Sequence, residues 1–302
     1  MSLPVVWHPD YVAPLKPGHR FPMSKYGYLR EALVARKVLP GSGGYVAPAP
    51  ARYAQIAAVH DPGYTDRVLT QTLRPDETRV IGLPGSAAVA RRAALSAAGT
   101  TLAARLALEH GLACNMAGGS HHAGPEGGSG YCVFNDVAVA ARALLDEGVV
   151  ARVLVVDFDV HQGDGTARIF ADEPGVFTMS LHAGRNFPVR KARSDLDVSL
   201  EDGLGDGPYL EAAGAALDWA IAEAQPQIAF YNAGVDPFSE DRLGRLALSS
   251  AGLRARDRLA LGRLRAAGVP VVGVLGGGYD GDMERLAGHH AILFEEAARL
   301  MQ

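Results

Sequence analysis

Five acidic and imidazole side chains in two segments have the types and spacing of a metal site. Asp157, Asp159 and His161 occupy alternate positions of an extended segment, so their side chains project to one side. Asp236 follows a separate apolar run and supplies a further carboxylate. Asp159, His161 and Asp236 would leave one coordination position open, which is the arrangement of a catalytic zinc site. The alternative is a helix cap at Asp164 beside a surface histidine, which would leave two carboxylates unpaired at the end of a buried strand.

Two adjacent histidines, His121 and His122, follow another apolar run inside a glycine-rich loop. Asp157 and Asp164 are candidate partners that would accept the Nδ1 hydrogen of each ring and so fix its tautomer. This arrangement is typical of a catalytic base with an orienting carboxylate. The alternatives are that the two rings are structural or are themselves metal ligands.

Tyr279 follows three consecutive glycines, 276–278. These glycines match neither of the common phosphate-binding patterns, and they would let the backbone pass closely enough to bring a phenol to the site. Such a phenol would donate a hydrogen bond to a developing oxyanion. Cys132 is a candidate nucleophile, but a small buried residue beside the pocket is the favoured interpretation. Structural or solvent-facing roles are assigned to His182, His289 and His290.

These side chains must be positioned by an α/β fold, because short apolar runs alternate with longer helical patterns along the chain. Several runs are apolar throughout, as at 153–156, which is typical of strands buried on both faces of a parallel sheet. The predicted strands are Val5–Trp7, Leu112–Met116, Val153–Asp157, Val176–Leu181, Ile228–Tyr231 and Val271–Leu275. The predicted helices span 86–110, 134–147, 208–224, 250–267 and 281–301. Together they predict a doubly wound α/β sandwich that forms a single domain over residues 1–302.

Polar, glycine-rich segments follow four of these runs, and they contain the candidate metal ligands, the paired histidines and the tyrosine. In open parallel sheets, ligands bind beyond the carboxyl ends of the strands. Segments that are far apart in the sequence are therefore expected to converge on one site. These segments are 118–122, 157–164, 232–236 and 276–279.

The composition excludes several classes of protein. The chain has 302 residues, of which 48% are hydrophobic, and its 29 basic and 33 acidic residues give a net charge of −4. This balance excludes a disordered chain and argues against a nucleic-acid binder. No apolar stretch reaches the roughly 18 residues that a membrane span needs. An apolar run begins at Val5, which leaves no room for a signal peptide, and two cysteines make no disulfide scaffold, so a cytoplasmic location is expected.

Five segments together resemble the zinc-dependent histone deacetylase family in order and spacing. They are GGSHHAGPEGGSGYCVFND (118–136), VDFDVHQGDGT (156–166), SLH (180–182), YNAGVD (231–236) and GGGY (276–279). The segment 232–257, which begins with Asn232, is most similar to class IV, the branch of human histone deacetylase eleven. The segment GHRFPMSKYGYL (18–29) resembles bacterial members of that class.

The resemblance implies the arginase/deacetylase fold, a three-layer α/β/α sandwich around an eight-stranded parallel sheet. It assigns zinc to Asp159, His161 and Asp236. The catalytic residues that it implies are the proton-transferring pair His121 and His122, their orienting carboxylates Asp157 and Asp164, and the oxyanion-binding phenol Tyr279. It also implies a potassium ion near the zinc, held partly through backbone carbonyls by Asp157, Asp159, His161, Ser180 and Leu181. The substrate-binding residues that it implies are Gly130, Tyr131, Phe187 and Gly277.

We therefore expect a zinc-dependent amidohydrolase that removes acetyl or longer acyl groups from lysine side chains of proteins or peptides. The alternative is a deacetylase of acetylpolyamines or another small acylated amine, which would place acidic residues at the tunnel rim, with Glu126 and Asp195 as candidates. An arginase-like two-manganese hydrolase would leave Tyr279 without a role. A non-catalytic relative would lack a ligand, a histidine or the phenol, and none of these is missing.

Two departures from the family pattern concern the substrate. Tyr131 stands where phenylalanine is usual in the tunnel wall, which adds a hydroxyl to the pocket. Many relatives also carry an acidic residue that grips the substrate backbone, and residues 81–86 contain none. With a net charge of −4, the chain is also less suited to a basic histone tail than the family name suggests.

Overall fold

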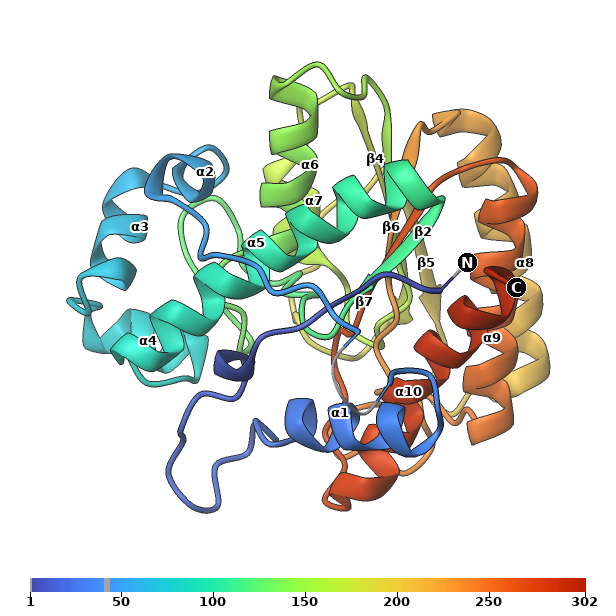
Figure 1. Ribbon diagram of the computed structural model, residues 1–302, viewed down its shortest axis with the longest axis horizontal. Coiled ribbons are helices and arrows are strands. Elements are labelled where there is room, and N and C mark those ends of the chain that lie inside the picture. Colours follow the sequence, from blue (N-terminus) through green and yellow to red (C-terminus); the bar gives the residue numbers. More distant parts are fainter. Residues whose placement is uncertain (1, 41–43) are drawn as a thin grey trace.

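The computed structural model describes residues 2–40 and 44–302 and shows a seven-stranded sheet between two layers of helices (Figure 1). Every neighbouring pair of strands is parallel. In their order across the sheet, the strands are β1 (Val5–Val6), β2 (Leu112–Asn115), β7 (Val271–Val274), β6 (Ile228–Asn232), β3 (Val153–Asp157), β4 (Val176–Ala183) and β5 (Leu196–Leu200).

Each face of the sheet has its own hydrophobic core, because side chains alternate between the two faces along a strand. On β3, Val153 and Val155 pack in the core under α5 and α6, whereas Leu154 and Val156 pack in the core under α8, α9 and α10. Figure 1 shows these two groups of helices on opposite sides of the strands. Their bounds are α5 (Ala87–His110), α6 (Asp136–Asp146), α8 (Asp206–Ala224), α9 (Ser250–Ala266) and α10 (Met283–Leu300).

Side-chain caps fix where the helices next to the site begin. The Ser86 hydroxyl accepts a hydrogen bond from the Val89 N–H at 3.3 Å at the start of α5. The Asn135 side chain accepts from the Ala138 N–H at 3.0 Å at the start of α6. Asn135 therefore ends the glycine-rich loop and begins the helix that follows it.

The five predicted helices and six predicted strands are all present, with bounds that differ by up to two residues at each end. The helices α1, α2, α3, α4 and α7 and a 3₁₀ turn were not predicted, because most are too short to show a helical period. These elements are α1 (Lys25–Ala35), α2 (Tyr53–Ala57), α3 (Pro62–Leu69), α4 (Pro75–Ile81), α7 (Asp164–Ile169) and the 3₁₀ turn Pro9–Tyr11. Within the described ranges, no helix has both the length and the apolarity needed to cross a bilayer.

The expected eight-stranded sheet is wrong for the described residues, which form seven strands. Beside the edge strand β1, Val46 makes a single bridge to Val6, and its N–H donates to the Val5 carbonyl at 2.8 Å. Pro48 and Pro50 follow it closely. Because proline has no N–H to donate, the pairing does not continue into an eighth strand. At the other edge, β5 was not predicted, because its side chains are mostly partly or fully exposed.

Candidate active site

The order of the strands brings the four polar segments together. β2, β7, β6 and β3 are consecutive neighbours in the sheet, and one polar segment follows the carboxyl end of each. All strands are parallel, so these ends lie along one edge. The predicted convergence of the segments is confirmed.

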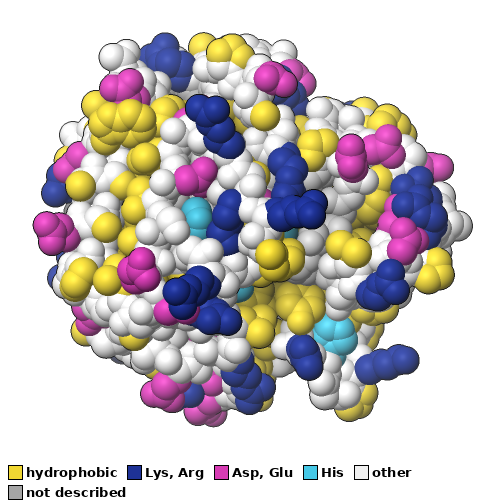
Figure 2. Space-filling model, turned by 180° about the vertical axis from the view of Figure 1, so that it is seen from behind, with side chains coloured by type: hydrophobic (Ala, Val, Ile, Leu, Met, Phe, Trp, Pro, Cys, Tyr) yellow, Lys and Arg dark blue, Asp and Glu magenta, His cyan; other side chains and the backbone are white. Residues whose placement is uncertain are grey.

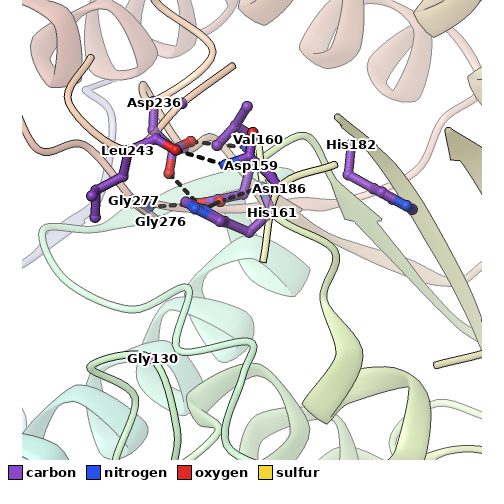
Figure 3. Close-up of polar contacts among 12 residues, drawn as sticks. Gly130, Asp159, Val160, His161, His182, Asn186, Asp236, Leu243, Gly276 and Gly277 are labelled. Carbon is purple, nitrogen blue, oxygen red and sulfur yellow. Dashed lines mark hydrogen bonds and ion pairs between the residues drawn. The ribbon is translucent and has the colours of Figure 1, made fainter. Parts of the chain in front are cut away.

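Three predicted metal ligands meet at the ends of β3 and β6 (Figure 3). The Nδ1 atom of His161 lies 3.0 Å from Asp159 Oδ1 and 3.1 Å from Asp236 Oδ2. Atoms held at 2.0–2.2 Å from one tetrahedral metal are roughly 3.3 Å apart, so these separations fit a shared ion. All three side chains are buried.

The charge of this cluster also fits a cation. Asp159 and Asp236 are two fully buried carboxylates, and no lysine or arginine of the described residues lies within 4.0 Å of either. Burial lowers the pKa of His161, but hydrogen bonds to the two carboxylates outweigh this effect and raise the pKa to about 10. Buried negative charge requires a compensating positive charge, and a divalent ion at this point would supply it.

Gly277 passes so close to the predicted metal ligands that no other residue fits there. Its N–H donates to Asp159 Oδ2 at 2.6 Å (Figure 3). A Cβ atom at this position would lie 2.0 Å from Asp236 Oδ2, well inside contact distance. The glycine at this position therefore allows the backbone after β7 to contact both carboxylates.

The paired histidines each have their own carboxylate partner. Nδ1 of His121 lies 2.7 Å from Asp157 Oδ2, and Nδ1 of His122 lies 2.6 Å from Asp164 Oδ1. The two ring centroids are 4.1 Å apart. Asp164 is the first residue of α7, where the cap position is Gly163, so the helix-cap alternative for Asp164 is wrong. Its carboxylate instead joins His122 and Arg168.

The pKa values of the two histidines are shifted in opposite directions. Burial lowers the pKa of His121, but the charges of Asp157 and Asp159 outweigh this effect and raise the pKa to about 9. Burial and the neighbouring charge of His121 lower the pKa of His122 to about 3, although Asp164 opposes the shift. These opposite shifts favour the protonated form of His121 and the neutral form of His122.

Tyr279 reaches the same space from the segment after β7. Its backbone N–H donates to Asp241 Oδ2 at 2.7 Å, and its ring lies 6.2 Å from that of His161. Burial and the charges of Asp159 and Asp236 raise the pKa of the phenol well above its usual value. The phenol thus stays protonated and able to donate a hydrogen bond.

A pocket of about 630 Å³ leads from the surface to these groups. His122, His161 and Tyr279 line it, and Tyr131 and Phe187 form part of its walls. Phe187 stands edge-on to His122 with 4.8 Å between the ring centroids. Gly130 has a φ of 53°, and a Cβ atom there would lie 2.6 Å from the His122 ring, so glycine is required beside the histidine.

Several other predicted residues lie outside this pocket. The Cys132 thiol is buried, and burial raises its pKa, which favours the interpretation of a small buried residue over that of a nucleophile. His182 lies on β4 and points away from the metal ligands (Figure 3). His289 and His290 belong to α10.

Neither acidic candidate for the tunnel rim is part of the pocket wall. Asp195 instead accepts hydrogen bonds from the N–H and hydroxyl of Thr178, and Glu126 lies in the glycine-rich loop. The interpretation that placed Glu126 and Asp195 at the rim is wrong.

The sequence analysis missed two groups of residues near the site. Arg79, Arg185 and Arg245 line the pocket, but they belong to no motif. Arg256 is fully buried on α9, where it pairs with Asp257 at 2.8 Å and donates to the carbonyls of Phe158 and Gly234. The sequence signal for this second group was an arginine next to an aspartate within the predicted helix 250–267. Charged residues of this kind are rarely buried unless they are paired.

The family model of the histone deacetylase domain matches residues 19–293. The chain belongs to the histone deacetylase domain family. It is 48% identical over 297 residues to an uncharacterized protein of Picosynechococcus sp., with 98% of this chain and 99% of the relative covered.

Named members of the histone deacetylase family match over shorter lengths. Histone deacetylase 2 of Arabidopsis thaliana is 34% identical over 60% of this chain, and histone deacetylase clr6 of Schizosaccharomyces pombe is 33% identical over 56%. The chain covers 48% and 43% of these two proteins, which is about half of their length. A crystal structure titled for the HDA15 HD domain has the same fold, with a TM-score of 0.80 at 22% identity over 98% of this chain and 89% of that one.

Proposed function

We propose that this histone deacetylase family member is a metal-dependent amidohydrolase that removes acyl groups from the side-chain amine of lysine. The observation that supports the proposal most strongly is the meeting of the metal-ligand cluster, the two histidine–carboxylate pairs and Tyr279 at the base of one pocket. The pocket is walled by aromatic rings, which suits the long apolar side chain of an acyl-lysine.

Asp159, His161 and Asp236 would hold the metal, for which zinc is the best candidate given one imidazole and two carboxylate ligands. A bound divalent ion at this point would lower the pKa of water and polarise the amide carbonyl. The residues of the proposed potassium site lie at the ends of β3 and β4, where Asp157 pairs with Ser180 in register. The whole proposed set for that ion remains Asp157, Asp159, His161, Ser180 and Leu181.

His122 is the proposed general base. Its Nδ1 atom is engaged by Asp164, so Nε2 is the nitrogen available to a water in the pocket. His121 is the proposed general acid, because the carboxylates around it favour its protonated form. It would donate its own proton to the leaving amine, which departs as a free amine, while His122 would hold the proton taken from the water. Tyr279 would donate its hydroxyl to the developing oxyanion.

We also propose that the chain is most closely related to class IV histone deacetylases and to bacterial members of that class. This part of the proposal rests on the segments 18–29 and 232–257. Hydrolysis rates for a panel of acyl-lysine peptides, from acetyl to myristoyl, measure the preferred length of the acyl chain. Acylpolyamines are the second candidate substrates. They are cations, and no acidic residue among those described lines the pocket to receive them.

Metal content and amide hydrolysis of Asp236→Ala test the proposal. The substitution removes one of three ligands, so bound metal and hydrolysis of an acetyl-lysine peptide should be lost together, by about 10²-fold or more in rate, because a metal contributes several kcal/mol to catalysis. The matched control is Asp218→Ala, which removes an exposed carboxylate paired with Arg263. Unchanged hydrolysis by a folded Asp236→Ala protein would overturn the proposed mechanism.

A further inference from the structure

Three arginines from three separate segments surround the entrance of the pocket. Arg79 lies in the last turn of α4, Arg185 in the loop after β4, and Arg245 in the segment after β6. All three are exposed, whereas the histidines in the same pocket are buried. Figure 2 shows Lys and Arg side chains gathered around a hollow on one face of the molecule. The arginines therefore form a charged rim above the reacting groups.

This positive charge is only partly neutralised by the protein itself. Arg245 makes one exposed ion pair with Asp202 at 3.1 Å. Over residues 2–40 and 44–302, no carboxylate lies within 4.0 Å of Arg79 or Arg185. Other surface arginines do pair, as Arg67 does with Glu77 and Arg285 with Asp280.

The rim also contrasts with the molecule as a whole. The chain has a net charge of −4, so a basic surface is not its general character. Segment 81–86 lacks an acidic residue, and Arg79, two positions before this segment, lines the pocket instead. Arginine stays charged at any physiological pH, and its planar fork matches the geometry of a carboxylate or phosphate.

We propose that the substrate carries a carboxylate close to its acylated amine, and that Arg79, Arg185 and Arg245 select for that group. The inference rests on the proposed amidohydrolase function of the same pocket. The anionic group has two possible sources, the free α-carboxylate of an acyl-lysine or an acidic residue beside it in a peptide. A rim of this charge repels a cationic acylpolyamine.

Paired substrates measure this selection directly. The first pair is two acetyl-lysine peptides of equal length, with aspartates or with lysines beside the acetyl-lysine. The second pair is acetyl-lysine with a free α-carboxylate and the same compound as an amide. An exposed ion pair changes binding by about twofold to fivefold, so kcat/KM should favour the anionic member by at least that factor. The preference should shrink as salt rises to 0.5 M, since screening shortens the range of exposed charges.

The variants Arg79→Gln, Arg185→Gln and Arg245→Gln should each reduce the ratio of kcat/KM for the anionic and cationic peptides by about twofold to fivefold. Asp202→Asn should increase the ratio, because it removes the carboxylate that occupies Arg245. Arg105→Gln is the control, since that arginine is exposed on α5 and pairs with Glu147. It should leave the ratio unchanged.

The possible results separate this inference from the proposed function. Selection in the first pair alone assigns the anion to a neighbouring peptide residue, and selection in the second pair alone assigns it to the α-carboxylate. Hydrolysis of both members of each pair at equal kcat/KM, or arginine variants with the ratio of the wild type, would overturn the selection for an anion. A metal-loaded protein that hydrolyses none of the four compounds would instead count against the proposed function.

Discussion

At the scale of single residues, the site depends on side chains that are held in one orientation by a buried partner. Each paired histidine binds a different carboxylate, so each ring has its own fixed orientation although the two ring centroids are 4.1 Å apart. The phenol of Tyr279 differs from them, because no hydrogen bond of its hydroxyl within the described residues fixes it. Its hydroxyl is therefore available to a substrate.

Tyr279→Phe tests the role of that hydroxyl. The variant keeps the aromatic ring and the backbone contact to Asp241, so it should bind metal as the wild type does. Removal of one oxyanion donor commonly costs about 10²–10³-fold in kcat. Metal analysis and kcat for an acetyl-lysine peptide measure the two properties separately, with Tyr28→Phe on the exposed face of α1 as the control. Equal loss of metal and activity would mean that the tyrosine is structural.

At the scale of elements, α9 packs against the segments that carry the proposed metal ligands. Arg256 donates to the backbone carbonyls of Phe158 and Gly234. Phe158 immediately precedes Asp159, and Gly234 lies two residues before Asp236. Asp257 accepts a hydrogen bond from the Tyr231 hydroxyl at 2.6 Å and so ties the same helix to β6. This buried pair fixes the positions of the two strand ends relative to each other.

Arg256→Met should therefore destabilise the protein strongly. The substitution leaves Asp257 buried without its charged partner, which costs about 3–5 kcal/mol in free energy of unfolding. The double variant Arg256→Met/Asp257→Leu removes the unpaired charge and should recover part of the loss. Urea unfolding of both proteins measures the difference. A single variant as stable as the wild type would show that the pair does not hold the strand ends.

At the scale of the whole molecule, the sequence was sufficient for the parts that depend on continuous patterns. Runs such as Val153–Asp157 identified the central strands, since a buried parallel strand is apolar throughout. The short helices α2 and α4 and the edge strand β5 have no such pattern, and they were missed. The arginine rim was missed for a different reason. Arg79, Arg185 and Arg245 are ordinary surface residues in sequence, and only the fold brings them to one opening.

A buried histidine links the helical region before α5 to the rest of the molecule and makes stability depend on pH. The Nδ1 atom of His60 lies 2.7 Å from the Gly124 carbonyl, and its Nε2 accepts from the Asn135 N–H at 2.9 Å. Burial lowers its pKa from 6.5 to about 4, although the hydrogen bond to the Gly124 carbonyl opposes the shift. Between about pH 4 and 6.5, the unfolded chain therefore binds a proton at His60 that the folded protein does not bind.

The sign of the effect follows from that difference. The contribution of neutral His60 to stability is complete above about pH 6.5 and is lost as the pH falls towards 4, by about 1–3 kcal/mol. His60→Gln keeps a donor and an acceptor without the titration, so the slope of unfolding free energy against pH should decrease by about one proton near pH 5. His110→Gln, at the end of α5, is the control. An unchanged slope in His60→Gln would contradict the prediction.

The close approach of Gly277 to the carboxylates makes the positions of two parts of the site depend on one stretch of backbone. The N–H of Gly277 binds a metal-ligand carboxylate, and its carbonyl accepts from the Val235 N–H at 2.9 Å, one residue before the next ligand. Tyr279 follows only two residues later. A shift of the strand ends that disturbs the proposed ligand set would therefore also displace the phenol, so the proposed metal centre and the proposed oxyanion donor depend on the same backbone geometry.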